Sequence, residues 1–189
     1  MNDFEYHKYL LTRSLLGKMY RNYYLYPRIN NYTKGKILDV GCGIGDFLSF
    51  NKNAIGTDIN KYNIDYLREK KMNAVLMEKD KLPFNNNKFH SILLDNVIEH
   101  LISPEKLINE FVRVSINNAN LIVGVPGLKG YKRDPDHKVF YTRDKLNNLF
   151  RKYGYVKNKT LYFPFRFPFL SANLSSYSIF CIYKLIKNS

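Results

Sequence analysis

The feature that most constrains the fold is a short apolar run that leads directly into three alternating glycines. Residues 37–40 are apolar except for Asp39, and the turn after them contains Gly41, Cys42, Gly43 and Gly45. Glycine permits a sharp turn and a close approach of the backbone to a ligand, and a following helix presents its positive N-terminal dipole there. A dinucleotide-binding fingerprint needs another glycine where this chain has Asp46, so a pyrophosphate site is disfavoured. The run therefore predicts a strand, a cofactor-binding turn and a helix.

A second apolar run ends in an acidic residue at an informative distance from the glycines. Residues 54–58 are typical of a strand, and Asp58 lies 17 residues beyond Gly41. This is close to the roughly 20 residues expected before a carboxylate that accepts hydrogen bonds from ribose hydroxyls. The glycines alone would also fit a tight loop, but such a loop does not account for the position of Asp58. The two runs together predict one β-α-β unit that binds a cofactor.

Four stretches, in the expected order, resemble class I S-adenosylmethionine-dependent methyltransferases. They are residues 37–47, residues 55–58, Leu82-Pro83-Phe84 with Lys88-Phe89, and the Val-Ile-Glu-His-Leu stretch 97–101. The chain is most similar to the small single-domain group found among enzymes of glycan, lipid and quinone modification. One departure is His90, where the family usually has aspartate, and we expect it to begin the fourth strand away from the ligand.

The resemblance implies S-adenosyl-L-methionine as the cofactor and an α/β fold. The expected fold is a doubly wound, Rossmann-like, seven-stranded and mostly parallel sheet, with an antiparallel C-terminal strand and helices on both faces. By the same resemblance, Glu78 would accept from the adenine amino group, with Asp80 as the competing assignment. Ligands of such sheets lie beyond the carboxyl ends of the strands. The predicted cofactor-binding residues are Asp39, Gly41, Cys42, Gly43, Gly45, Asp58, Ile59, Glu78, Lys79, Asp95 and Asn96.

Length and composition fit one methyltransferase domain over residues 1–189, because a chain of this size buries a core without disulfides. We expect residues 1–35 to form an N-terminal helical cap, residues 36–126 the cofactor-binding half, and residues 127–189 the acceptor loop and C-terminal strands. Two cysteines indicate packed thiols in a reducing compartment, and no apolar run approaches the ~20 residues of a bilayer span. The sequence predicts a soluble, cytoplasmic protein. It predicts no metal centre, because its four histidines are scattered.

The net charge of +14 is distributed unevenly along the chain. Residues 1–36 contain seven Lys/Arg and two Asp/Glu, residues 37–126 contain ten and eleven, and residues 127–189 contain thirteen and three. In the resembling family the first and last segments surround the acceptor, and a cleft of one sign attracts the opposite sign. This favours a phosphorylated or otherwise acidic acceptor, or an anionic surface. The alternative is compositional drift in a chain rich in Lys and Asn, in which the lysines only solvate helices.

The segments outside the cofactor half supply candidates for acceptor contacts. Residues 4–26 predict one or two amphipathic helices that cap the acceptor pocket, although their tyrosines could instead only pack against the sheet. Residues 128–141 form a polar loop after the fifth strand. The predicted acceptor-binding residues there are Lys132, Arg133 and Tyr141. Residues 155–187 predict two antiparallel strands, joined by the aromatic and basic segment 163–169, which either covers the core or makes a peripheral membrane contact.

Two histidines are candidates for a catalytic base. Methyl transfer is an in-line displacement, so the enzyme mainly positions the acceptor and excludes water, but a hydroxyl must also lose its proton. Neutral imidazole suits that task near pH 7. His137 lies in the predicted acceptor loop, where the resembling glycan-cluster enzymes have a histidine, and His100 ranks second, with bracing of the cofactor loop as its alternative role. The sequence thus predicts O-methylation of a small anionic acceptor, such as a phosphorylated or nucleotide-linked sugar in cell-surface polysaccharide biosynthesis.

Three other functions stay open at this point. A nucleic-acid acceptor would be gripped by the basic segments, but the chain has no appended recognition domain, and Asp95-Asn96 does not match the Asn/Asp-Pro-Pro-Tyr/Phe tetrapeptide of many base-amino methyltransferases. A lipid or quinone acceptor would fit the resembling group. A non-catalytic interaction module would bind the cofactor without turnover.

Overall fold

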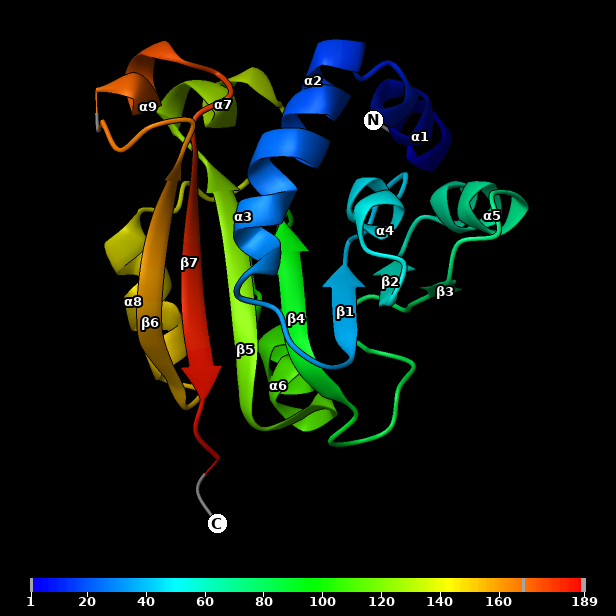
Figure 1. Cartoon of the computed structure of the whole chain (residues 1–189), viewed down its shortest axis with the longest axis vertical. Coiled ribbons are helices and arrows are strands. Elements are labelled where there is room, and N and C mark those ends of the chain that lie inside the picture. The colour runs from blue at the N-terminus through cyan, green and yellow to red at the C-terminus, as the bar shows by residue number, and fades with distance from the viewer. Residues whose placement is uncertain (1, 168, 188–189) are drawn as a thin grey trace.

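A seven-stranded sheet runs through the computed structural model, which describes residues 2–167 and 169–187 (Figure 1). The strands are β1 (Ile37–Val40), β2 (Ala54–Asp58), β3 (Ala74–Leu76), β4 (Phe89–Asp95), β5 (Ser115–Pro126), β6 (Tyr155–Phe163) and β7 (Ser178–Leu185). Their order is β3-β2-β1-β4-β5-β7-β6. Neighbouring strands from β3 to β5 are parallel, whereas β7 runs antiparallel to β5 and to β6. The predicted Rossmann-like sheet with an antiparallel C-terminal strand is confirmed.

Helices cover both faces of this sheet. They are α1 (Asp3–Leu11), α2 (Leu15–Tyr20), α3 (Tyr26–Asn30), α4 (Asp46–Phe50), α5 (Lys61–Glu69), α6 (Glu105–Val114), α7 (Leu128–Arg133), α8 (Arg143–Arg151) and α9 (Leu170–Asn173). A π-helix, Arg21–Leu25, joins α2 to α3, and a 3-10 turn, Ile98–His100, follows β4. Successive strand residues point to opposite faces. Leu93 accordingly packs in the cluster with α3, α4 and α5, and Ile92 packs in the cluster with α6 and α8.

The structure corrects the expectation that residues 128–141 are a loop throughout, because residues 128–133 form α7. Tertiary contacts hold this short polar helix against α9. The Leu128 N–H donates to Ser171 Oγ at 2.9 Å, and Lys129 Nζ donates to Asn173 O at 2.9 Å. The predicted pair of antiparallel C-terminal strands is present as β6 and β7, and β6 ends directly before Pro164. Within the predicted connecting segment, Pro168 lies outside the described residues.

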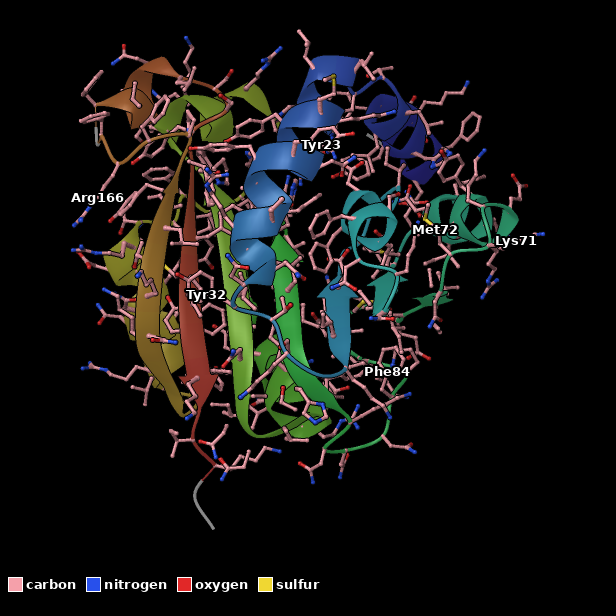
Figure 2. The ribbon with its side chains drawn as sticks, viewed as in Figure 1. Tyr23, Tyr32, Lys71, Met72, Phe84 and Arg166 are labelled. Atoms are coloured by element: carbon pink, nitrogen blue, oxygen red, sulfur yellow. The ribbon has the colours of Figure 1, made fainter. Side chains whose placement is uncertain are left out.

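The N-terminal residues form three short helices and a π-helix, instead of the one or two regular helices that were expected. Their tyrosines divide between core and surface. Tyr26 is buried in the core, whereas Tyr23 is 78% exposed on the outer side of these helices (Figure 2). Among the described residues, no helix has the length and apolarity needed to cross a membrane.

The carboxyl ends of β1, β4 and β5 meet at the upper end of the sheet in Figure 1, and α1, α2, α7 and α9 gather there. The N-terminal helix is tied to the β2-α5 segment. Asn60 Nδ2 donates to Asp3 O at 2.7 Å, and His7 Nδ1 lies 2.8 Å from Asn63 Oδ1. This end of the sheet is where ligands of such folds bind. The division of the chain into a cap, a cofactor half and an acceptor segment stays a prediction.

Candidate cofactor and acceptor site

The turn after β1 has a left-handed backbone that requires glycine. Gly41 and Gly45 have φ angles of +69° and +79°, which side chains rarely adopt. A Cβ atom on Gly41 would lie 2.6 Å from Val97 Cγ2, and one on Gly45 would lie 2.5 Å from Leu67 Cδ2. Any other residue at these positions would therefore displace the Val97 or Leu67 side chain, or would shift the turn away from them.

Asp58 closes this turn from the end of β2. Its Oδ2 accepts from the Gly43 N–H at 2.8 Å, and its Oδ1 accepts from the Asn60 N–H at 2.8 Å. Burial raises the pKa of Asp58, and these hydrogen bonds act against the rise. Oδ2 also accepts from Asn63 Nδ2 at 3.4 Å, whereas Oδ1 keeps a second lone pair for another donor. The glycine turn and Asp58 therefore fit a cofactor that carries ribose hydroxyls.

The other predicted cofactor-binding residues differ in exposure. Asp39 and Cys42 are buried, and burial followed by the nearby Asp95 raises the pKa of Asp39 well above its usual range. Asp95 and Asn96 are part-buried at the carboxyl end of β4. The exposed residues of the set are Ile59, Glu78 and Lys79. Glu78 and the competing Asp80 both follow β3, and the choice between them stays open.

Two arginines from the N-terminal helices enter the same region, and the sequence analysis assigned neither of them a role. Arg21 forms an ion pair with the buried carboxylate of Asp95, and its Nε lies 3.4 Å from Asp46 Oδ2. Arg13 also pairs with Asp46. Burial opposes the charge of Arg21, but Asp95, Tyr26 and Asp39 together outweigh burial and raise its pKa. Basic residues scattered along an amphipathic helix give no signal of such pairing, so the sequence could not identify them.

Two neighbouring residues, Glu99 and His100, meet the distant His137 beyond β4 and β5. His137 Nε2 lies 3.8 Å from Glu99 Oε1, and the two imidazole rings have centroids 4.7 Å apart. The segment that carries His137 is held in place because the N–H groups of Lys138 and Val139 donate to Glu99 O at 2.8 and 3.0 Å. The structure thus brings both predicted catalytic histidines together, and it adds Glu99, to which the sequence assigned no role.

Backbone groups orient the two imidazole rings. His137 Nδ1 lies 2.8 Å from Tyr131 O, so Nδ1 carries the proton and Nε2 is left as the acceptor. Its ring also stacks on the Tyr131 ring, with centroids 5.4 Å apart. Burial and the neighbouring His137 lower the pKa of His100, and a hydrogen bond with the Asp136 backbone acts against this. In each ring, therefore, one nitrogen forms a hydrogen bond with a backbone group, and the other nitrogen is left for another partner.

Glu99 is the least satisfied polar group of the cluster. Its side chain is fully buried, and neither carboxyl oxygen has a hydrogen-bond partner among the described residues. Burial, together with Asp95 and Asp134, raises the pKa of Glu99 to about 8. Buried polar atoms in native proteins nearly always have partners, so this carboxyl group requires an explanation.

The three predicted acceptor-binding residues lie in two environments. Lys132 and Arg133 are exposed at the end of α7. Tyr141 is buried in the core cluster with residues of α6 and α8, and burial raises its pKa. Contact of these residues with an acceptor stays a prediction.

The cofactor half of the chain matches a known family. Residues 38–123 match the family model described as a methyltransferase domain, and they contain both the glycine turn and Asp58. Residues 38–123 are therefore identified as a methyltransferase domain. The predictions of such a domain, and of S-adenosylmethionine as the cofactor of this family, are therefore confirmed.

Relatives and solved structures extend the likeness of this methyltransferase domain. An uncharacterized protein of Methanocaldococcus jannaschii is 33% identical over 124 residues, which are 62% of this chain and 53% of that protein. The tRNA (carboxymethyluridine(34)-5-O)-methyltransferase alkbh8 of Xenopus tropicalis is 29% identical over 120 residues, which are 58% of this chain and 19% of that protein. A second uncharacterized protein of Methanocaldococcus jannaschii is also similar to this chain. This chain spans about half the length of the two archaeal relatives, 45% of the second and 53% of the first.

A crystal structure of a SAM-dependent methyltransferase from Archaeoglobus fulgidus has the same fold. It aligns with a TM-score of 0.73 at 20% identity, over 96% of this chain and 98% of the other. The whole chain, and not only the matched segment, therefore follows the architecture of this methyltransferase.

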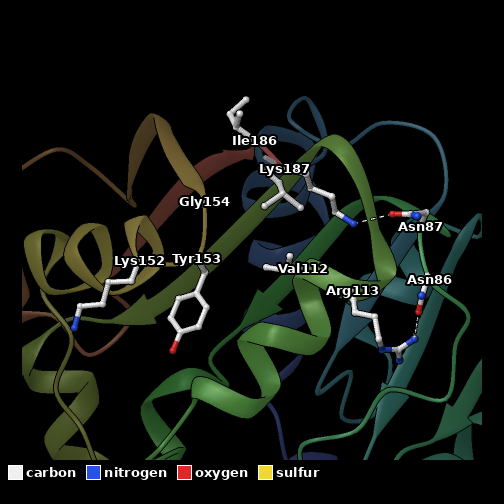
Figure 3. Close-up of a pocket in the computed structure, with 10 residues that line it drawn as sticks. Asn86, Asn87, Val112, Arg113, Lys152, Tyr153, Gly154, Ile186 and Lys187 are labelled. Atoms are coloured by element: carbon white, nitrogen blue, oxygen red, sulfur yellow. Dashed lines mark hydrogen bonds between the residues drawn. The ribbon is translucent and has the colours of Figure 1, made fainter. Parts of the chain in front are cut away.

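A separate pocket lies at the opposite end of the sheet (Figure 3), where the parallel strands begin. Four of its polar side chains form hydrogen bonds in pairs. Arg113 Nη1 donates to Asn86 Oδ1 at 2.9 Å, and Lys187 Nζ donates to Asn87 Oδ1 at 2.7 Å. None of the residues predicted to bind cofactor or acceptor is among those that line this pocket.

Proposed function

We propose that this chain is an S-adenosylmethionine-dependent O-methyltransferase that acts on a hydroxyl of a small anionic acceptor, such as a phosphorylated or nucleotide-linked sugar. The observation that carries the proposal is the position of His137. Its Nε2 is free to accept a proton and lies 3.8 Å from the Glu99 carboxyl group, beyond the carboxyl ends of β4 and β5. The glycine turn and Asp58 would hold the cofactor, which supplies an electrophilic methyl group when it is bound.

In this proposal His137 takes the hydroxyl proton on Nε2 while the acceptor oxygen forms its bond to the methyl carbon. Tyr131 O keeps Nδ1 protonated, so the ring becomes a cation when it accepts the second proton. Asp134 Oδ2 lies 3.9 Å from Nε2 and would stabilise that charge. Burial of His137, whose side chain is 7% exposed, would keep bulk water from competing with the acceptor.

The charge distribution supports an anionic acceptor. Residues 127–189 contain thirteen basic and three acidic residues, and they include the segment that carries His137. Lys132 and Arg133 are exposed at the end of α7, only a few residues before His137. Their positive charge would draw a phosphate-bearing acceptor toward the cluster. Phosphorylated and nucleotide-linked sugars of cell-surface polysaccharide biosynthesis have this chemistry.

A nucleic-acid acceptor is the second candidate, and the relatives favour it. The Xenopus relative is named as a tRNA methyltransferase that acts at a carboxymethyluridine. The same basic segment would bind phosphates of an RNA, and binding would then weaken steeply with salt. A carboxylate acceptor oxygen is already deprotonated, so it would need alignment and desolvation but no base.

Turnover of methyl-labelled S-adenosylmethionine tests the proposal. Wild type and His137→Ala would be assayed in parallel with phosphorylated sugars, nucleotide sugars, total tRNA, and a quinol or lipid fraction. We expect label in a sugar fraction with wild type, and a strong loss with the variant. Label in tRNA alone would identify a nucleic-acid acceptor, the second candidate. Label in the quinol or lipid fraction would identify an acceptor of that class. Cofactor binding without label in any fraction would contradict enzymatic activity and indicate an interaction module.

A further inference from the structure

The buried carboxyl group of Glu99 has no partner among the described residues, yet two imidazoles adjoin it. Glu99 is 0% exposed, and both of its carboxyl oxygens lack hydrogen bonds there. Leaving such a group unsatisfied costs free energy, and proteins accept that cost where a ligand provides the missing interaction. The ligand must suit one carboxylate oxygen and two imidazole nitrogens.

The spacing of these atoms is close to that of a metal coordination sphere. One nitrogen or oxygen from each of Glu99, His100 and His137 lies within 4.8 Å of the other two, and the distance from His137 Nε2 to Glu99 Oε1 is 3.8 Å. Ligand atoms at about 2.0–2.2 Å from a zinc-like ion are roughly 3.4 Å apart when the geometry is tetrahedral. Small side-chain rotations would close the remaining gap.

The surroundings of the two rings add an independent observation. A metal-binding histidine almost always donates its other N–H group to a carbonyl or carboxylate, which fixes the ring. His137 Nδ1 is held at 2.8 Å by Tyr131 O, and His100 has a hydrogen bond with the Asp136 backbone. Both rings therefore have the outer support that metal ligands have.

The geometry points to a site for one divalent transition-metal ion, held by Glu99, His100 and His137. Two imidazoles with one carboxylate suit zinc, iron, cobalt or manganese better than magnesium or calcium, which prefer oxygen ligands. Three protein ligands leave a coordination position open. The sequence analysis expected no metal centre because the histidines are scattered along the chain, and the fold removes that objection by bringing two of them together.

The catalytic use of this ion rests on the proposed function, whereas its binding does not. An acceptor hydroxyl that coordinated the ion would have a lowered pKa and would release its proton to solvent on binding, before water is excluded. The oxygen would then form its bond to the methyl carbon as the carbon–sulfur bond breaks. His137 is then a ligand in the ion-loaded chain, and it acts as the base only in the ion-free chain.

Ion binding to the full chain tests the site. The chain would be freed of metal with a chelator and titrated calorimetrically with ZnCl₂ and with MnCl₂. Cobalt(II) absorption would report the number of ligands. We expect one ion per chain, and an affinity loss greater than about tenfold in Glu99→Gln and in His137→Asn. His90→Asn is the matched control, because His90 lies at the other end of β4 and should leave the affinity unchanged.

Several results would overturn the inference. One is the absence of saturable ion binding in wild type. Another is an equal ion affinity of wild type and Glu99→Gln, provided that circular dichroism shows the variant to be correctly folded. If Glu99→Gln does not fold, equal affinities of wild type and His100→Asn would overturn it instead. If the chain binds no ion and chelation does not affect methyl transfer, the metal site is excluded and the proposed function is retained. One bound ion with no methyl transfer to any acceptor would retain the metal site and remove the proposed function.

Discussion

The two ends of the sheet use their polar residues in opposite ways. At the amino end, the Arg113 guanidinium donates to Glu110, to Leu82 O at 3.0 Å and to Phe84 O at 2.7 Å, and Glu110 also accepts from the Leu82 N–H at 2.8 Å. At the carboxyl end, Glu99 is fully buried with neither oxygen bonded among the described residues. The glycine turn at that end also has a backbone that only glycine adopts readily.

This difference separates a polar network that holds the fold from residues arranged for a ligand. The open pocket lies at the amino end, but Arg113 and Lys187, two of the cations that line it, are already used in hydrogen bonds with Asn86 and Asn87. The carboxyl end is covered by the N-terminal helices, and it contains Glu99, whose buried carboxyl group has no hydrogen bond among the described residues. Our proposal of a site at the carboxyl end therefore rests on the unbonded Glu99 carboxyl group and the glycine turn, and not on an open hollow.

The largest expected effect comes from Gly43→Val, which should abolish S-adenosylmethionine binding in a folded chain. Gly43 has a φ angle of +52°, and a Cβ atom there would lie 3.3 Å from Leu10 Cδ1, so a β-branched side chain would strain the turn under α1. Calorimetry and circular dichroism measure both properties. Gly154→Ala is the matched control, a positive-φ glycine at the amino end, and it should lose stability while keeping cofactor affinity. Normal binding by Gly43→Val would remove the turn from the cofactor site.

His137→Ala in the ion-free chain should lower turnover by ~10²–10⁴-fold, because it removes the proton acceptor, while cofactor affinity stays intact. Single-turnover kinetics with the identified acceptor would measure the change. A loss of less than about tenfold would contradict the role of His137 as base. The same assay on His100→Ala would then show whether the base is His100 or whether the acceptor oxygen is already anionic.

Asp58→Ala should weaken S-adenosylmethionine binding by about tenfold or more. Two hydrogen bonds to a charged acceptor disappear, each worth ~1.5–3 kcal/mol, and the Gly43 and Asn60 N–H groups also lose their partner. Titration calorimetry gives the dissociation constant. Asp144→Ala, which removes an exposed carboxylate paired with Arg143, should leave it unchanged. Equal constants for wild type and Asp58→Ala would exclude Asp58 from the ribose site.

Reversal of charge with Lys132→Glu and Arg133→Glu should raise the KM for the acceptor severalfold at low salt, and the wild-type KM should itself rise with salt. Cofactor affinity should stay the same, because both side chains are exposed on α7 and outside the glycine turn. The double variant Lys152→Glu with Lys187→Glu at the amino-end pocket serves as the charge-matched control. Unchanged kinetics across the salt series would favour compositional drift as the origin of the positive charge.

The smallest effect is expected at the amino end, where Glu110→Gln should reduce the free energy of unfolding by about 1 kcal/mol or less at pH 7. The side-chain hydrogen bonds from Arg113, together with the Leu82 N–H, lower the pKa of Glu110. Its contribution is therefore present above the unfolded-state pKa and is lost as pH falls through the lowered folded-state value. Urea denaturation should show wild type and variant converging in acid. A difference that grows on acidification would contradict this account.

The sequence predicted those features that depend on local backbone requirements. The alternating glycines predicted the turn after β1, and the fourth strand, expected to begin at His90, is present as β4 from Phe89. The spacing from Gly41 to Asp58 predicted a carboxylate at the end of β2, and Asp58 indeed closes the turn through the Gly43 N–H. These features could be predicted because each follows from a few neighbouring residues.

The cluster around Glu99 could not be predicted in the same way, because its geometry depends on contacts between distant segments. The approach of His137 to Glu99 requires the loop after α7 to donate two N–H groups to Glu99 O. The helix α7 was itself missed, since a short polar segment that contains Gly130 has little intrinsic helix propensity and is held by contacts with α9. The ion pair between Arg21 and Asp95 joins the N-terminal helices to the end of β4, 74 residues further along the chain.

The most direct test of the central claim is an NMR titration of the ¹⁵N-labelled chain with S-adenosylmethionine. The cofactor is claimed to bind at the covered carboxyl end of the sheet, and not in the open pocket at the amino end. We predict that the backbone amide signals of residues 41–45 and of Asn60, whose N–H donates to Asp58, shift and saturate together. The signals of Tyr153, Gly154 and Lys187 in the amino-end pocket should stay in place. Shifts confined to that pocket, or no shift at residues 41–45 at saturating cofactor, would contradict the account.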